Sequence, residues 1–360
     1  MTINPRVSRR IAIQAGMAAT AALAAAPMVR ASNKSGRGPV TVGSGAHTYE
    51  VEHDWARLPG THAFGNTHGV GIDSQGMVYI KHTVHASSSS ADAVCVFDAR
   101  GAFVRSWGAE FRGGAHGLTL SCEPGGEFLY LCDCNRSVVR KTTLTGENVL
   151  EFAWPEASGV YGSIGEYKPT NVAVVPFEAV NAAGRPHAQR GRVFIADGYG
   201  KSWIHEYDAA GAYIRTFGGP GRERGQTSCP HGLAVDSRSG SPRLVVADRG
   251  NRRLQYFTLD GRHDGFVAEE MRSPCHFDTL GELLLVPDLE ARVTLLDKQN
   301  KLIAHLGDGE NFGLRDKARE QFVAGKFIAP HSACFDKDGN IFVVEWVEVG
   351  RVTRLKRVGT

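Results

Sequence analysis

Histidines recur at equivalent places along this chain of 360 residues. Six short stretches share a histidine or asparagine followed by apolar residues and a turn, as in "PHGLAVD" from Pro230 to Asp236. The residues at this shared position, here called the opening positions, are His68, His116, Asn171, His231, His276 and His331. Because the sequence contains only 14 histidines, five of them at six matched positions exceed what chance would place there. A turn before a strand needs no imidazole, so the pattern indicates chemistry.

Three of these histidines, His116, His231 and His331, belong to alternate repeats. Imidazoles that converge on one axis can each offer a nitrogen to a single metal ion at about 2.0–2.1 Å, leaving a fourth position for water or substrate. Zinc is the expected ion, although iron and copper also accept imidazole, and a structural Ca²⁺ is a further candidate. The competing interpretation is that the rings only bind backbone carbonyls or ordered water.

The opening positions of the remaining three repeats are His68, Asn171 and His276. We expect these residues behind the metal ligands or in contact with substrate.

The elements that must position these residues are short strands. Successive opening positions lie 45 to 60 residues apart, and each repeat contains four apolar stretches separated by turns. This period predicts an all-β, six-bladed β-propeller, in which the first strand of each blade lines the central channel. The last repeat is one strand short, and "HTYEVEHDWARLPG" before the first opening supplies it. The N-terminal strand should therefore complete the last blade and close the ring.

The N-terminal segment has the layout of an export signal. Arg9 and Arg10 precede an Ala-rich apolar stretch that ends at Ala31, which is typical of a twin-arginine signal peptide. We therefore expect a signal over residues 1–31, a linker over 32–46 and the propeller over 47–360. The protein should reach the periplasm or be secreted, already folded and with its cofactor.

Charge and cysteine content restrict the partners. Removing residues 1–31 removes four arginines and no acidic residue, which lowers the net charge from +3 to −1. This balance predicts no nucleic-acid partner and no membrane contact after signal removal. We expect a monomer that takes a small-molecule or peptide-like substrate. The seven cysteines are an odd number, and "CDC" lacks the spacer of a zinc ribbon.

Several motifs carry a family resemblance. "VVADRGNRRLQYF" (Val245–Phe257) resembles NHL-type repeats, and the order "AHGL", "PTNVAVVP", "RVFIADGYGKSWIHEY", "PHGLAVD", "APHSA" resembles the peptidyl-hydroxyglycine α-amidating lyases. The resemblance implies a propeller with zinc held by His116, His231 and His331. It also implies an active-site base at Tyr199, in "DGY", and a substrate-binding Arg249, in "ADR".

The sequence departs from that family at three places. The family's other catalytic arginine falls on His82, with Lys81 beside it, and we expect these two to orient substrate. Gly200 stands where the family has a disulfide-forming cysteine, and Ser332 where it has an aspartate. The expected metal ligands are therefore retained better than the residues that handle substrate.

Three functions compete at this point. The first is an exported zinc-dependent lyase that cleaves the C–N bond of a carbinolamide, with Tyr199 as the base. The second is a lactonase- or esterase-like hydrolase, whose metal would use oxygen ligands such as Asn171, Asp288 and Glu345. The third is a non-catalytic NHL propeller that binds a protein or peptide.

Overall fold

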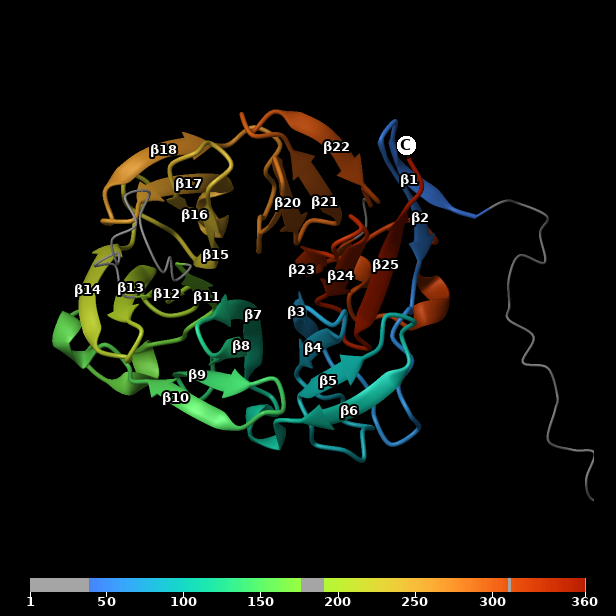
Figure 1. The fold of residues 1–360 in the computed structure, drawn as a ribbon, viewed down its shortest axis with the longest axis horizontal. Helices are drawn as coiled ribbons and strands as arrows, with labels where there is room; N and C mark the ends of the chain where they lie inside the picture. The colour runs from blue at the N-terminus through green and yellow to red at the C-terminus, as the bar shows by residue number, and fades with distance from the viewer. Residues whose placement is uncertain (1–38, 176–190, 310–311, 360) are drawn as a thin grey trace, which may run out of the picture. The chain divides into compact units, whose positions relative to one another are not determined.

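Six antiparallel sheets surround a central axis (Figure 1). The computed structural model describes residues 39–175, 191–309 and 312–359, and the compact unit spans Val40–Thr360. The expected signal peptide, residues 32–38 of the expected linker and nearly all of residues 177–192 lie outside the described residues. The prediction of an all-β, six-bladed β-propeller is confirmed.

Five blades are built from four consecutive strands each. The first contains β3 (Thr67–Ile72), β4 (Val78–His82), β5 (Val94–Phe97) and β6 (Phe103–Trp107). The second contains β7 (Ala115–Glu123), β8 (Gly126–Asp133), β9 (Val138–Thr143) and β10 (Asn148–Phe152). The third contains β11 (Asn171–Val174), β12 (Arg192–Ala196), β13 (Trp203–Asp208) and β14 (Tyr213–Gly218). The fourth contains β15 (Pro230–Asp236), β16 (Arg243–Asp248), β17 (Arg253–Thr258) and β18 (His263–Val267). The fifth contains β19 (Asp278–Leu280), β20 (Leu283–Asp288), β21 (Arg292–Leu296) and β22 (Leu302–Leu306).

The sixth blade joins the two ends of the propeller. β23 (Pro330–Phe335), β24 (Ile341–Glu345) and β25 (Arg351–Arg357) continue into β2 (His47–Glu52), which pairs antiparallel with β25. The expected closure by an N-terminal strand is thus confirmed. A fifth strand, β1 (Thr41–Ser44), pairs with β2, so the compact unit begins within the segment expected to be a linker.

Short single-turn 3-10 helices occupy some connections between strands. They are η1 (Ala109–Phe111), η2 (Glu156–Ser158), η3 (Ile164–Glu166), η4 (Arg249–Asn251), η5 (Phe312–Leu314) and η6 (Arg319–Gln321). Over the described ranges, no helix has the length and apolar character needed to cross a membrane.

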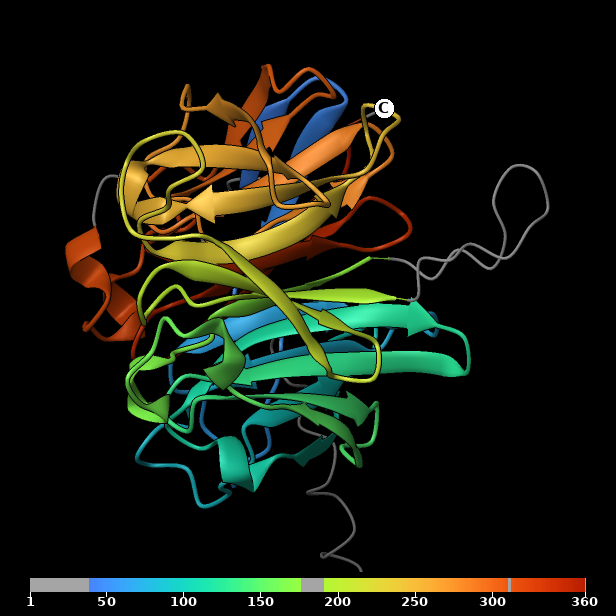
Figure 2. The ribbon, with the colours of Figure 1, turned by 90° about the vertical axis from the view of Figure 1, so that its left-hand side faces the viewer.

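The hydrophobic core is divided among the interfaces between neighbouring blades. One cluster, for example, packs Tyr79 and Val94 of the first blade against Leu118, Leu129 and Leu131 of the second. The second strand of each blade is covered on both faces and therefore reads as a continuous apolar run rather than an alternating one. In β16, the side chains from Leu244 to Ala247 are fully buried. In the view turned by 90°, the strands of neighbouring blades lie one above another (Figure 2).

Candidate metal centre

Three histidines from alternate blades meet at the axis of the propeller. His116 in β7, His231 in β15 and His331 in β23 have ring centroids 4.7–4.8 Å apart in every pairing. Each is almost completely buried, with 2–3% of its surface exposed. The structure therefore brings together the three residues that the sequence predicted as metal ligands.

One ring nitrogen of each histidine is fixed by a backbone carbonyl of the adjacent blade. His116 Nδ1 lies 2.7 Å from the oxygen of Thr170, His231 Nδ1 lies 2.9 Å from that of Cys275, and His331 Nδ1 lies 2.8 Å from that of His68. A carbonyl only accepts, so each Nδ1 must donate its hydrogen and each Nε2 keeps a lone pair. This carbonyl partner is the arrangement that orients metal-bound histidines in proteins.

Burial keeps the three imidazoles uncharged. It lowers the pKa of His116 to about 3 and holds the pKa values of His231 and His331 well below the usual range, with Arg249 and neighbouring histidines adding to the effect. Neutral imidazole is the form that binds a metal ion. The donor set and its protonation therefore fit a divalent cation.

Irregular strand pairing aims the histidine side chains at the axis. The pairing of β7 with β8 shifts between Ala115 and Leu118, and that of β15 with β16 shifts between Pro230 and Leu233. Shifts at the same place interrupt β23 at His331 and β3 at His68. Such bulges commonly re-aim a side chain beside a functional site.

Glycines after two of the histidines permit the close approach of the next blade. A Cβ added at Gly117 would lie 2.3 Å from the oxygen of Thr170, and one at Gly232 would lie 2.3 Å from the oxygen of Cys275. These are the carbonyls that accept from His116 and His231. The glycine in "HGL" is therefore needed to bring each carbonyl within reach of its imidazole.

An acid at the end of the second strand holds the turn before the opening position. In four blades, the carboxylate of this acid accepts a hydrogen bond from the backbone N–H of the residue three positions before the opening position. The pairs are Asp197 with Lys168 at 2.6 Å, Asp248 with Ser228 at 2.7 Å, Asp288 with Ser273 at 2.8 Å, and Glu345 with Ile328 at 2.7 Å. Asp288 and Glu345 are thus committed to backbone hydrogen bonds, which weakens the case for an oxygen-ligated metal.

Tyr199, which the resemblance implies as the active-site base, lies beside His116 and His231. Its hydroxyl is 3.2 Å from His116 Nε2 and 3.1 Å from His231 Nε2, although 44% of the residue is exposed. Burial of the hydroxyl raises the pKa of Tyr199 to about 12, against the opposing charge of Arg249. At neutral pH the phenol is therefore protonated in the absence of a metal.

Arg249 completes this side of the cluster. Its guanidinium lies 5.3 Å from the centre of the Tyr199 ring and contacts the sulfur atoms of Cys229 and Cys275 at 3.2 and 3.8 Å. No carboxylate is paired with Arg249 among the described residues. It is therefore available to hold an anionic group of a ligand.

The remaining opening positions differ in their contacts. His68 Nδ1 lies 3.3 Å from His331 Nε2, and its ring centroid is 4.8 Å from that of His116. Asn171 uses its side-chain oxygen to accept the N–H of Leu233 at 3.2 Å. His276 lies 3.3 Å from the Ser332 hydroxyl through Nδ1. Only His68 joins the three converging histidines directly.

His82 and Lys81 do not reach this cluster by hydrogen bonds in the part of the chain that is described. His82 ends β4 at the position of the strand-end acids, where its Nδ1 accepts the N–H of Val84 at 3.1 Å and approaches that of Gly65 at 3.4 Å. Lys81 is fully buried and donates to the carbonyl of Cys132 at 2.5 Å. His82 therefore shapes the turn before His68, and the structure gives neither residue a contact with the expected substrate position.

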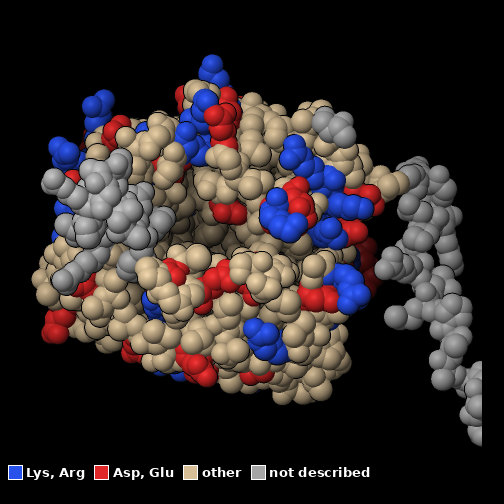
Figure 3. Space-filling view, in the orientation of Figure 1, with Lys and Arg blue, Asp and Glu red and all other residues tan. Residues whose placement is uncertain are grey.

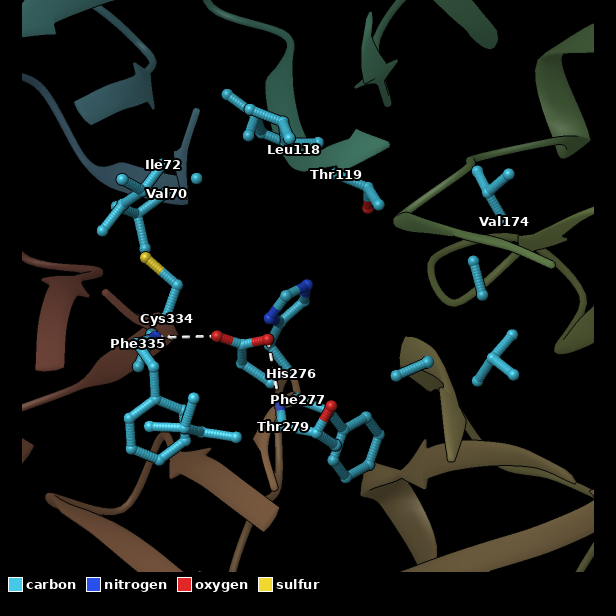
Figure 4. A pocket seen from close by; sticks show the side chains of 18 of the residues that line it. Val70, Ile72, Leu118, Thr119, Val174, His276, Phe277, Thr279, Cys334 and Phe335 are labelled. Atoms are coloured by element: carbon cyan, nitrogen blue, oxygen red, sulfur yellow. Dashed lines mark hydrogen bonds between the residues drawn. The ribbon is translucent and has the colours of Figure 1, made fainter. Parts of the chain in front are cut away.

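A channel continues along the axis. Its volume is about 460 Å³, and its wall is made of the first strands of the blades, with His276, Thr119 and Cys334 among the lining side chains (Figure 4). Asp278 in this wall accepts the N–H groups of Phe335 and Thr279 at 2.7 and 2.8 Å. Burial raises the pKa of Asp278 to about 6. The face seen in Figure 3 is hollowed at its centre.

Sequence reasoning missed the residues that support the ligands. The carbonyls of Thr170 and Cys275 carry no side-chain signal, and no motif in the sequence assigns a role to Cys229 or Cys275. The available signal for these residues was their position in the sequence, one or two residues before an opening position. All seven cysteines are free thiols.

Comparison with known proteins supports the fold. No family model matches the chain. It is 36% identical over 106 residues to peptidyl-glycine alpha-amidating monooxygenase of Mus musculus, covering 28% of this chain and 9% of that protein. It is 26% identical over 247 residues to NHL repeat-containing protein 3 of Mus musculus, covering 64% of this chain and 65% of that protein. The chain is a six-bladed β-propeller that is similar in sequence to an NHL repeat-containing protein.

Solved structures share this architecture. A catalytically inactive virginiamycin B lyase from Staphylococcus aureus has a TM-score of 0.53 at 12% identity, covering 86% of this chain and 100% of that one. A gluconolactonase from Xanthomonas campestris has a TM-score of 0.55 at 12% identity, covering 89% and 96%. At this identity the likeness shows the propeller fold and nothing about the activity of this chain.

Proposed function

We propose that this propeller is a metal-dependent lyase that works in the periplasm or outside the cell and cleaves the C–N bond of a carbinolamide. One observation carries the proposal: three neutral imidazoles from alternate blades converge, and because each Nδ1 donates to a backbone carbonyl, each Nε2 keeps its lone pair. The partial similarity to an amidating monooxygenase supports this class of substrate. Zinc is the ion we favour, held by His116, His231 and His331.

Such an ion would polarise a substrate oxygen and favour the ionised form of a nearby phenol. Tyr199 would act as the base, and the position of its hydroxyl 3.1–3.2 Å from two of the proposed ligands supports this role. It would remove the proton of the substrate hydroxyl as the carbon–oxygen double bond forms and the C–N bond breaks. The departing amide nitrogen then takes a proton, which gives a primary amide and an aldehyde.

Arg249 would orient the substrate. A carbinolamide derived from glycine carries a carboxylate, and the guanidinium of Arg249 stacks beside Tyr199 without a carboxylate partner in the described chain. A charge-assisted hydrogen bond from this group could hold the carboxylate next to the base. The product aldehyde would then be glyoxylate.

The test begins with metal content. Elemental analysis of the full chain should find about one zinc per molecule, and His231→Ala should lose it while His263→Ala, on the outer strand β18, should retain it. The metal-loaded protein should then release glyoxylate from a peptide that ends in α-hydroxyglycine. A folded protein that takes up no added metal would overturn the proposal and favour a binding scaffold. A metal-loaded protein that leaves the peptide intact would contradict the lyase activity alone.

A further inference from the structure

We propose that His68 is a fourth protein ligand, so that the metal is held by four imidazoles from the first, second, fourth and sixth blades. This inference rests on the metal centre proposed above and adds a residue to it. The candidate ligand atoms of His68, His116 and His331 all lie within 4.8 Å of one another, and all three rings are buried. These three form a potential metal-binding group even before His231 is counted.

The separation between His68 and His331 matches that of two ligands on one ion. Two nitrogens bound at about 2.0–2.1 Å with a tetrahedral angle between them lie about 3.3 Å apart. His68 Nδ1 and His331 Nε2 are 3.3 Å apart. His331 Nδ1 donates its hydrogen to the carbonyl of His68. The Nε2 atom of His331, which faces His68, therefore carries a lone pair and no hydrogen.

A simple hydrogen bond between the two rings competes with this interpretation. In that arrangement His68 Nδ1 would donate to His331 Nε2 and occupy the lone pair that a metal needs. His331 could then bind the ion only if His68 moved away. Sharing the ion removes this conflict, because both lone pairs then point at the same positive charge.

The strand that carries His68 has the same irregularity in its pairing as the strands that carry the three proposed ligands. The pairing of β3 with β4 shifts between Thr67 and Gly69, at the same place as the shifts that aim His116, His231 and His331. The other two opening residues lack this device: Asn171 pairs regularly with Ala196, and His276 precedes the start of β19. The same local irregularity that directs three imidazoles to the axis thus directs a fourth.

Four imidazoles change how substrate would reach the ion. His68 lies against His331 and His116, whereas Tyr199 lies between His116 and His231. A substrate oxygen would therefore enter as a fifth ligand on the Tyr199 side, as some zinc sites allow. The base and the incoming oxygen would then share one side of the centre.

X-ray absorption of the Zn²⁺-loaded full chain tests the proposal, because scattering from the outer atoms of imidazole counts the bound rings. We expect four imidazoles in the parent and three in His68→Ala and in His68→Gln. Competition with a chelator should show a loss of zinc affinity of more than about 100-fold in both variants, above the 10- to 100-fold typical of residues behind a ligand. His276→Ala, the matched control at another opening position, should keep four imidazoles.

The outcomes separate the two proposals. Three imidazoles in the parent, with the same count in folded His68→Gln, would overturn the role of His68 and leave the three-histidine centre intact. A parent that binds no zinc would overturn both. The glutamine variant keeps a polar side chain of similar reach, and its circular dichroism spectrum would show that a lost ligand is not a lost fold.

Discussion

The hydroxyl of Tyr199 can be separated from metal binding at the scale of a single residue. Tyr199→Phe removes the proposed base but leaves the imidazoles and their carbonyl partners unchanged. We expect zinc content to remain at the parent value and glyoxylate release to fall about 10²- to 10⁴-fold, the usual contribution of a positioned acid or base. Elemental analysis and a steady-state assay measure the two effects. A variant with parental turnover would exclude Tyr199 as the base.

Single residues also show which parts of the candidate site could be predicted from the sequence. The histidines at His116, His231 and His331 could be predicted to converge, because equivalent positions in a closed ring of repeats must face the same axis. His82 could not be placed from the family motif, since its role depends on the end of β4. There the chain uses an imidazole nitrogen where other blades use a carboxylate.

At the scale of the strand, the glycine after a histidine should control the centre. Gly232→Ala would place a Cβ 2.3 Å from the carbonyl of Cys275 and push it away from His231 Nδ1. Overpacking of this kind costs about 1–3 kcal/mol, and loss of the ligand's partner weakens metal affinity about 10- to 100-fold. Thermal unfolding and chelator competition would measure both.

The matched control is Gly265→Ala in β18. A Cβ added there meets no atom within 4 Å, so stability and zinc affinity should stay at the parent values. If Gly232→Ala behaved like this control, the close approach of the blades would not position the imidazole.

The strands could be predicted from the apolar pattern and the repeat period of the sequence, but the register shifts in their pairing could not. The first and second strands of each repeat could be predicted from apolar runs bounded by turns. The shift between Thr67 and Gly69 lies where the first blade approaches its neighbour, since a Cβ added at Gly69 would lie 2.6 Å from the side chain of Leu118. Contacts between distant parts of the chain leave no local pattern in the sequence.

For the whole molecule, β2 is the element that closes the ring. Tyr49 in this strand is 1% exposed and belongs to the core between the fifth and sixth blades. A chain that starts at residue 53 would lose this side chain and leave β25 as an open edge. We expect it to unfold at a lower temperature, or to aggregate, since burial of one large side chain contributes about 2–3 kcal/mol. A chain that starts at residue 39 keeps β1 and β2 and should match the parent in calorimetry.

Buried histidines should make the molecule sensitive to acid. Burial lowers the pKa of His53 to about 4 and the pKa values of His82 and His205 to about 3. All three lie outside the proposed centre and use ring nitrogens in hydrogen bonds; His53 Nε2, for example, accepts the N–H of Gly325 at 2.9 Å. Protonation would therefore remove an acceptor as well as bury a charge.

The sign of this effect follows from proton binding in the two states. An unfolded histidine, with a pKa of about 6.5, takes up a proton between pH 6.5 and 3–4, whereas the folded residue does not, so the free energy of unfolding falls as pH falls through that window. Each histidine lowers the free energy of unfolding by about 1.4 kcal/mol per pH unit within this window, which amounts to about 2 kcal/mol at pH 5. Asp278, whose pKa burial raises to about 6, acts in the opposite direction below pH 6. Burial also raises the pKa values of Asp197, Asp248 and Asp288, so these carboxylates offset part of the loss.

We therefore expect the metal-free protein to be most stable above pH 6.5 and to unfold roughly 5 °C or more lower at pH 5 than at pH 7.5. Calorimetry in the presence of a chelator isolates this effect from metal release, which acid would also cause. Asp278→Asn removes one opposing carboxylate and should steepen the loss of stability between pH 6 and 5. An unfolding temperature that stays constant from pH 7.5 to 5 would mean that these imidazoles are protonated in the folded protein, and the hydrogen bonds described for them could not all persist.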